Sequence, residues 1–210
     1  PLMKVAQILA TIPDALPKEY ANELSHLQAD APSMGWLFVK RRMKAELGEN
    51  WLTHFKDFSK SASAAASLGQ VHFAEDNQGQ KLACKLQYPD MGSAVQADLK
   101  QLKLIFSLYE KYDSAISTKS IHEELSDRLK EELDYSHEIQ NMNLYRHMLS
   151  DYNEITLPKP IDSLSTNRLL TMTRIDGMKI MQFISENSDI EIRNQVAMNM
   201  FKAWYVPFYK

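Results

Sequence analysis

A tight turn between two strand-like segments is the feature that most restricts how this chain can fold. The turn is Asn77-Gln78-Gly79; residues 70–75 precede it, and residues 80–88, which alternate in polarity, follow it. Strands joined by so short a turn must pair antiparallel. Apolar residues recur at helical spacing on both sides of this hairpin. The sequence therefore predicts an α+β protein with a small antiparallel sheet rather than a βαβ array.

The other expected elements are mostly helices. A longer helix is predicted over residues 120–149, opened by the capping-box pattern Ser120-Ile121-His122-Glu123. Two further strands are predicted at 156–160 and 168–174, with a turn at Gly177. The remaining predicted helices cover residues 2–12, 20–27, 36–47, 91–112, 178–186 and 189–206.

Composition excludes several classes of protein. The 210 residues carry 24 Lys+Arg and 27 Asp+Glu, a net charge of −3, which is unlike a broadly basic nucleic-acid binder. A single cysteine, Cys84, excludes an internal disulfide and a multi-cysteine zinc site, and the histidines show no metal-ligand spacing. No run of 18 apolar residues and no signal-peptide pattern occurs. We therefore expect a soluble, intracellular protein in which Cys84 is a buried apolar residue.

A loop of small residues introduces the hairpin. It includes Ala64, Ala65, Ala66, Ser67 and Gly69. Small side chains let a ligand approach the backbone, whose amide groups can hold phosphate oxygens. A tight turn or a helix start is the common alternative for such an alanine-rich stretch.

The second strand of the hairpin contains a lysine among apolar residues. Alternation places Leu82 and Cys84 on one face, and Ala83 and Lys85 on the other. A lysine in this position needs a carboxylate partner, and such a strand lysine grips nucleotide phosphates in kinases. Acidic residues of the expected 120–149 helix could supply the partner or form a solvated face. In a continuous helix one face would hold Glu131, Asp134 and Glu138, while Glu132 would point roughly 200° away from Asp134.

These motifs, in this order, resemble the UbiB family of atypical kinase-like proteins, which is associated with ubiquinone (coenzyme Q) biosynthesis. Lys4-Val5-Ala6-Gln7 is similar to the family's lysine-x-glycine-glutamine signature, with Ala6 in place of glycine. The alanine-rich loop before Gly69 resembles the loop that replaces the kinase glycine-rich loop. Lys85 occupies the place of the nucleotide-gripping lysine. Glu132-Leu133-Asp134 and the later Glu138 are similar to the family's Glu-x-Asp motif and its helix glutamate. The resemblance covers essentially the whole chain.

The resemblance implies a role for each matched residue. Lys85 would hold the α- and β-phosphates of ATP or ADP, with Glu138 as its ion-pair partner. Ala83 would touch the adenine, and the alanine-rich loop would cover the phosphates. Backbone groups of the segment that follows the last strand of this lobe would meet the edge of the base; these are Met172, Thr173 and Arg174.

The N-terminal extension has an implied role of its own. Lys4 and Gln7 would fold over the cleft near Glu132 and Asp134, where a protein substrate would otherwise bind. The family resembles ATPases or small-molecule kinases more than protein kinases for this reason. The implied organisation is a helical extension over 1–58, a kinase-like N-lobe and hinge over 59–177, and the start of a helical C-lobe over 178–210.

The chain lacks two further kinase motifs. No histidine begins a His-x-Asp pattern and no Asp-Phe-Gly occurs, so ligands for Mg²⁺ are expected beyond Lys210 in a longer protein. The leading hypothesis is an ATP-binding atypical kinase or ATPase domain that supports ubiquinone synthesis, at the bacterial inner membrane or in mitochondria. Two alternatives stay open at this point: a non-catalytic nucleotide-binding scaffold and a helical interaction domain.

Two surface features complete the sequence analysis. A basic cluster, Lys40-Arg41-Arg42 with Lys44, is interpreted as a solvated helix face, with a contact to anionic lipid headgroups as the alternative. Residues 198–210 include five aromatic residues, which favours a core helix separated from the rest of its domain over an interfacial membrane segment. The expected partners are a nucleotide and, as alternatives, membrane lipid or ubiquinone-biosynthesis proteins.

Overall fold

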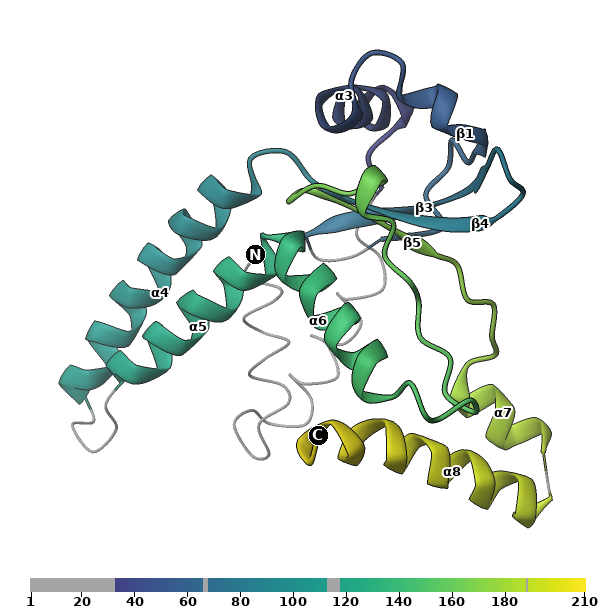
Figure 1. Ribbon diagram of the computed structural model, residues 1–210. Helices are drawn as coiled ribbons and strands as arrows, with labels where there is room; N and C mark the ends of the chain where they lie inside the picture. Colours follow the sequence, from purple (N-terminus) through teal and green to yellow (C-terminus); the bar gives the residue numbers. More distant parts are fainter. Residues whose placement is uncertain (1–32, 66–67, 113–117, 188) are drawn as a thin grey trace.

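A five-stranded antiparallel sheet lies in the upper part of the molecule as Figure 1 shows it. The computed structural model describes residues 33–65, 68–112, 118–187 and 189–210. The strands run in the order β1-β3-β4-β5, and β2 also pairs with β3. Their bounds are β1 Phe55–Phe58, β2 Ala64–Ala65, β3 Gly69–Asp76, β4 Lys81–Gln87 and β5 Leu169–Thr173. This confirms the predicted α+β class.

The predicted hairpin is the pair of long strands β3 and β4. Gly79 has φ +83°, the left-handed conformation that glycine adopts at no steric cost. The side chain of Asp76 accepts from the backbone N–H groups of Gln78 and Gln80, both at 2.8 Å, and so closes the turn. The resulting register places Val71 opposite Lys85.

The two faces of the sheet have different partners. Cross-strand pairing places Leu82, Cys84 and Leu86 on one face, where they join a buried cluster with Val39 and Met43 of α3 (Trp36–Leu47). The helix α3 has the predicted bounds, and Gly48, with φ +86°, ends it. The opposite face holds alternate residues of the same strands: Val71, Phe73, Ala83, Lys85, Leu170 and Met172.

An aromatic group fills the outer end of the α3 layer. Trp51 begins the short helix η1 (Trp51–His54) and is 4% exposed. Its ring contacts Trp36, Phe55 and Phe58 edge-on, at centroid distances of 6.0, 6.2 and 5.2 Å. The strand β1 was not predicted; two of its four residues, Phe55 and Phe58, face this group.

A pair of helices projects from the sheet as an arm, seen in Figure 1 as α4 (Met91–Tyr112) beside α5 (Thr118–Glu132). Leu99 and Leu102 of α4 pack with Leu125 and Leu129 of α5. Leu68, which lies just before β3, joins the same cluster and so connects the arm to the sheet.

The prediction of a single helix over residues 120–149 is wrong. Two helices, α5 and α6 (Tyr135–Met148), occupy this region and meet at Leu133 and Asp134. Asp134 has an extended backbone (φ −115°, ψ 100°), and its side chain accepts from the N–H of Ser136 at 2.9 Å. An aspartate in this position caps a new helix rather than continuing the old one. The capping-box prediction at Ser120 also fails, because α5 already includes Thr118.

The strand predicted over residues 156–160 is absent from the described structure. Pro160 forms an isolated bridge to Met172. The backbone N–H of Thr173 donates to Lys159 O, and the N–H of Lys159 donates to the side-chain hydroxyl of Thr173, both at 2.8 Å. Pro158 and Pro160 have no N–H to donate, so this segment cannot extend the ladder. The short helix η2 (Asp162–Leu164) follows it, before β5.

The last part of the chain is helical, as predicted, and consists of α7 (Ile180–Glu186), α8 (Ile190–Tyr205) and η3 (Val206–Phe208). Salt bridges from Lys202 to Glu154 (2.6 Å) and from Lys210 to Asp151 (2.8 Å) join this part to the loop after α6. Trp204 remains 65% exposed and Phe208 72% exposed. None of the helices in the described ranges has the length and hydropathy that crossing a bilayer requires.

Candidate nucleotide-binding site

An ion pair between the sheet and α6 lies at the centre of the candidate site. The ammonium group of Lys85 donates to both carboxylate oxygens of Glu138, at 2.6 and 2.9 Å. The lysine side chain is 25% exposed and the glutamate side chain 40%. The structure therefore brings together the two residues that the sequence analysis paired, and it leaves them open to a ligand.

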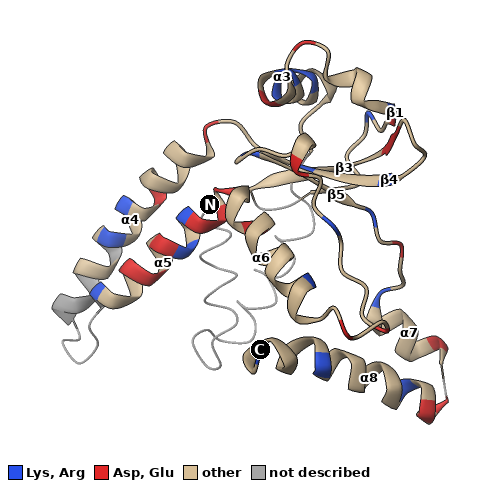
Figure 2. Ribbon diagram, viewed as in Figure 1, with Lys and Arg blue, Asp and Glu red and all other residues tan. Residues whose placement is uncertain are grey.

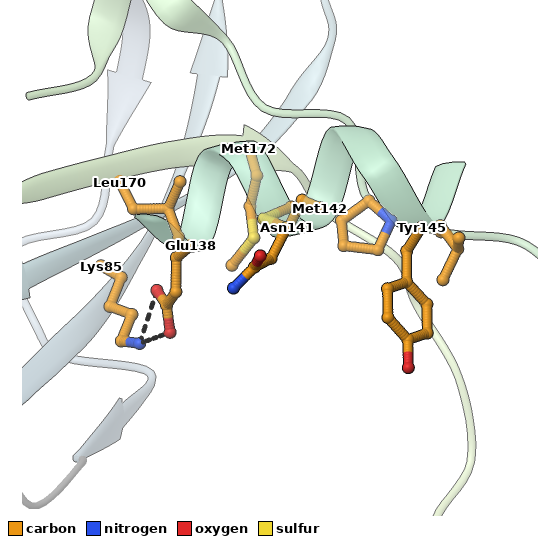
Figure 3. A pocket seen from close by; sticks show the side chains of 9 residues that line it. Lys85, Glu138, Asn141, Met142, Tyr145, Leu170 and Met172 are labelled. Carbon is orange, nitrogen blue, oxygen red and sulfur yellow. Dashed lines mark hydrogen bonds and ion pairs between the residues drawn. The ribbon is translucent and has the colours of Figure 1, made fainter. Parts of the chain in front are cut away.

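The pair stands at the edge of an apolar cavity of about 340 Å³ (Figure 3). Leu170 and Met172 of β5 and Met142 of α6 supply apolar lining. Most of the remaining lining also comes from α6 and from the proline-containing segment before β5. The full set is Lys85, Glu138, Asn141, Met142, Tyr145, Leu157, Pro158, Leu170 and Met172. A charged pair beside an apolar cavity suits a ligand with a flat apolar part and an anionic part.

Local structure at the start of α6 fixes Glu138 in place. Glu138 lies in the first turn of the helix capped by Asp134. Tyr135, which directly follows the capping residue Asp134, is 1% exposed, and its ring centre lies 4.7 Å from the Lys85 nitrogen. Its backbone N–H donates to Asn167 O at 3.0 Å, while the Gln87 side chain donates to Leu133 O at 2.9 Å. The beginning of α6 is therefore tied to the end of β4 and to the segment just before β5.

The predicted acidic face of Glu131, Asp134 and Glu138 does not exist, because the helix breaks between the first and the last of them. Glu131 pairs with Arg128 at 3.3 Å on the exposed side of α5. Asp134 serves as the cap, and the Ser136 N–H that it accepts lowers the pKa of its carboxyl group. Only Glu138 of the three reaches Lys85.

Removing the cap should weaken α6. We expect Asp134→Ala to lower the free energy of unfolding by about 1 kcal/mol at neutral pH, because an orphan N–H loses its acceptor. Since the folded-state pKa lies below the ordinary value of 3.8, this contribution is present above that pH and is lost as the pH falls through the folded value. Urea unfolding at neutral and acidic pH measures both effects.

Two controls sharpen this prediction. Asp134→Asn keeps a capping side chain and should retain most of the stability without the acid loss. Asp127→Ala removes an exposed carboxylate whose partner is Lys130 on the same helix, and it should change stability far less. Equal effects of Asp134→Ala and Asp127→Ala would contradict the capping role.

The alanine-rich loop is only partly described. Ala64 and Ala65 form β2 against Val71 and Gln70 of β3, while Ala66 and Ser67 lie outside the described residues. Gly69 is constrained by packing, because a side chain there would collide with the backbone carbonyl of Leu86 and approach the Tyr135 hydroxyl. The sequence analysis missed Tyr135, whose only signal is a large aromatic residue directly after the helix cap.

The end of β5 differs from the sequence-based expectation in its hydrogen bonding. Met172 lines the cavity and lies opposite Ala83 of β4. The backbone N–H of Thr173 already donates to Lys159 O at 2.8 Å, and that of Arg174 to Lys81 O at 2.9 Å. These two donors are therefore not free for the edge of a base. The N–H groups of Ile175 and Asp176 have no acceptor among the described residues and are the next donors along the chain.

A charged group holds this segment against the hairpin. The Arg174 guanidinium lies 3.9 Å from the centre of the Phe73 ring and pairs with Asp176 at 2.6 Å. Asp176 also pairs with Lys81, the first residue of β4, at 3.2 Å. Through these side-chain contacts, Arg174 holds the end of β5 against the hairpin of β3 and β4.

The remaining predicted site residues are Lys4, Gln7 and Glu132. Lys4 and Gln7 lie outside the described residues. Glu132 is the last residue of α5, two positions before the cap. Within the described ranges no three His, Cys, Asp or Glu side chains come close enough together to hold a metal ion.

Cys84 is fully buried on the opposite face of β4, as the alternation predicts. The hydroxyl of Thr171 donates to its sulfur at 3.7 Å. Burial raises the pKa of the thiol to about 12, so it stays protonated at neutral pH.

Comparison with known proteins identifies the class to which this fold and site belong. Residues 26–209 match the ABC1 atypical kinase-like domain. The chain belongs to this family, also called UbiB, as the resemblance in the sequence predicted.

Individual relatives agree with the family assignment. The chain is 32% identical over 196 residues to "Atypical kinase COQ8, mitochondrial" of Saccharomyces cerevisiae, covering 88% of this chain and 39% of that protein. It is 31% identical over 210 residues to "Protein ACTIVITY OF BC1 COMPLEX KINASE 7, chloroplastic" of Arabidopsis thaliana, covering 99% of this chain and 30% of that protein. The chain thus spans roughly a third of the length of these relatives.

A solved structure supports the kinase-like fold. The Mycobacterium tuberculosis protein Rv3197, determined in complex with erythromycin, superposes with a TM-score of 0.68 at 27% identity. The match covers 93% of this chain and 48% of that one.

Proposed function

We propose that this chain is the ATP-holding part of an atypical kinase or ATPase, with the phosphates beside Lys85 and the base towards the apolar cavity. The observation that carries the proposal is the Lys85–Glu138 pair at the edge of that cavity. A lysine held by a helix glutamate is the arrangement by which kinase-like proteins position nucleotide phosphates. Family membership supports the same reading.

Each part of the nucleotide has a matching feature of the chain. Lys85 supplies a cation for phosphate oxygens, and Glu138, which accepts two of the hydrogen bonds that an ammonium group can donate, keeps it directed towards the cleft. Ala83, Leu170 and Met172 offer small or flexible apolar surface to the base. Ile175 and Asp176 offer the backbone N–H groups for its edge. When bound, Mg²⁺ would neutralise phosphate charge.

The relatives support a proposal for the biological role. Two proteins similar to this chain are named atypical kinases of the COQ8 type and are mitochondrial. We place the protein that contains this chain in support of ubiquinone biosynthesis, at a membrane surface. The transferred or hydrolysed group would be the γ-phosphate of ATP.

Nucleotide binding by the chain itself tests the proposal. We expect ATP and ADP to raise the melting temperature by several degrees at saturating concentration, since a ligand that binds the folded state stabilises it by mass action. AMP should have a much smaller effect because it lacks the β-phosphate. Thermal unfolding with each nucleotide, with and without Mg²⁺, measures this. Identical unfolding curves with ATP and without it would overturn the proposal.

A further inference from the structure

A second hollow lies on the other side of the sheet, between α3 and the ends of two strands. It has a volume of about 570 Å³ and includes Arg41 and Arg42 of α3, Asp90 of the turn after β4, and Arg168 just before β5. We call it the α3 groove. The Lys85 side chain projects from the opposite face of the sheet, so the groove is separate from the candidate nucleotide site.

Two of the three arginines are fixed by contacts inside the protein. Arg42 donates to Gln87 O (3.2 Å), Tyr88 O (3.3 Å) and a Glu46 carboxylate oxygen (3.1 Å). The Glu46 side chain is 4% exposed and also pairs with Arg168 Nε at 3.1 Å. Arg42 is therefore not part of a solvated face, which corrects that interpretation of the basic cluster. A buried carboxylate that holds two guanidinium groups gives them a definite geometry before any ligand arrives.

Donors in the groove remain unused. Arg168 pairs with Glu46 at Nε, its side chain is 49% exposed, and its terminal nitrogens donate no hydrogen bond to a described residue. Arg41 has no ion pair or hydrogen bond to any described residue. Guanidinium groups bind carboxylates and phosphates through paired N–H donors.

The α3 groove carries a positive charge, unlike the chain as a whole. Three arginines and one aspartate line it, whereas the whole chain has a net charge of −3. Figure 2 shows the basic positions on α3. The rest of the lining is apolar and includes Leu37, which is 58% exposed.

We infer that the α3 groove binds a small amphipathic anion, a phosphate or carboxylate carried on a short apolar body. Arg41 and Arg168 would hold the anion, and Leu37 and Phe38 would contact the apolar part. A free organic phosphate and the headgroup of an anionic lipid share this chemistry. The groove is a hollow of limited volume, which favours the free molecule.

Hexyl phosphate is a suitable probe, with hexanol and inorganic phosphate as partial ligands. We expect saturable binding of hexyl phosphate by calorimetry, weaker binding of phosphate and none of hexanol. Arg41→Gln should weaken binding about tenfold, because a charged donor is lost from a side chain that has no structural contact. Lys40→Gln is the matched control: it removes a neighbouring exposed charge outside the groove and should leave the affinity unchanged.

Two further arms make the outcome decisive. Lys85→Met should bind hexyl phosphate as well as the unmodified chain does, whether or not ATP binds, so the groove and the nucleotide site can fail independently. Absence of saturable binding, or equal losses in Arg41→Gln and Lys40→Gln, would overturn the inference. Arg41-dependent sedimentation with phosphatidylglycerol vesicles, but not phosphatidylcholine vesicles, without binding of free hexyl phosphate would also overturn it in favour of a lipid surface.

Discussion

Lys85→Met should weaken ATP binding by about 10- to 100-fold. The variant loses charge-assisted hydrogen bonds to phosphate oxygens, each worth about 1.5–3 kcal/mol, and a difference of 1.4 kcal/mol changes an affinity tenfold. It also leaves the Glu138 carboxylate without its partner, facing the place proposed for the phosphates. Titration of ATP by calorimetry measures the change.

Matched variants separate this effect from general damage. Lys100→Met removes an exposed lysine of α4 and should leave ATP affinity unchanged. Combining Lys85→Met with Glu138→Gln removes both charges, so the double variant should bind ATP no worse than Lys85→Met does. If Lys85→Met and Lys100→Met bound ATP equally well, the proposed position of the phosphates would be wrong.

The hairpin and its lysine could be predicted because both depend on short-range pattern. A turn such as Asn77-Gln78-Gly79 fixes the pairing of its neighbours, and alternation then assigns Lys85 and Cys84 to opposite faces. The structure agrees in both respects, with Cys84 buried against α3 and Lys85 towards α6.

The break at Asp134 could not be predicted from helical periodicity, because polar and apolar residues continue in a helix-like pattern through residues 120–149. An aspartate within a charged helix and an aspartate that caps a new one look alike in a single sequence. What distinguishes them here is tertiary: Gln87 binds Leu133 O, and Tyr135 is buried against the sheet. The pairing of Lys85 with Glu138, which the family resemblance implied, is therefore present, although the continuous helix expected around Glu138 is not.

The short strands were not predicted correctly for a different reason. The strand β2 has two residues and β1 has four, which is too short for alternation to stand out. The segment 156–160 forms an isolated bridge at Pro160 rather than a strand, because proline removes donors that a strand needs. In the site, the donors of Thr173 and Arg174 are taken by backbone carbonyls that no local pattern reveals.

Gly69→Ala should destabilise the protein by about 1–3 kcal/mol, the usual cost of forcing an extra carbon into a packed site. The added Cβ would meet the carbonyl of Leu86 on β4, and a backbone atom cannot turn aside as a side chain can. Displacement of β3 or of Tyr135 would also move the start of α6, which carries Glu138. ATP affinity should therefore fall together with stability, in urea unfolding and calorimetry respectively.

Gly92→Ala is a control that should change the stability in the opposite direction. Gly92 lies in α4 with no atom within 4 Å of an added Cβ, and alanine in a helix is favoured over glycine by up to about 1 kcal/mol. This variant should gain stability and keep its ATP affinity. If Gly69→Ala were as stable as the unmodified chain and lost ATP binding alone, Gly69 would act on the phosphates directly, as the family resemblance implied. Loss of stability and affinity together would assign it instead to the support that places Tyr135 beneath Lys85.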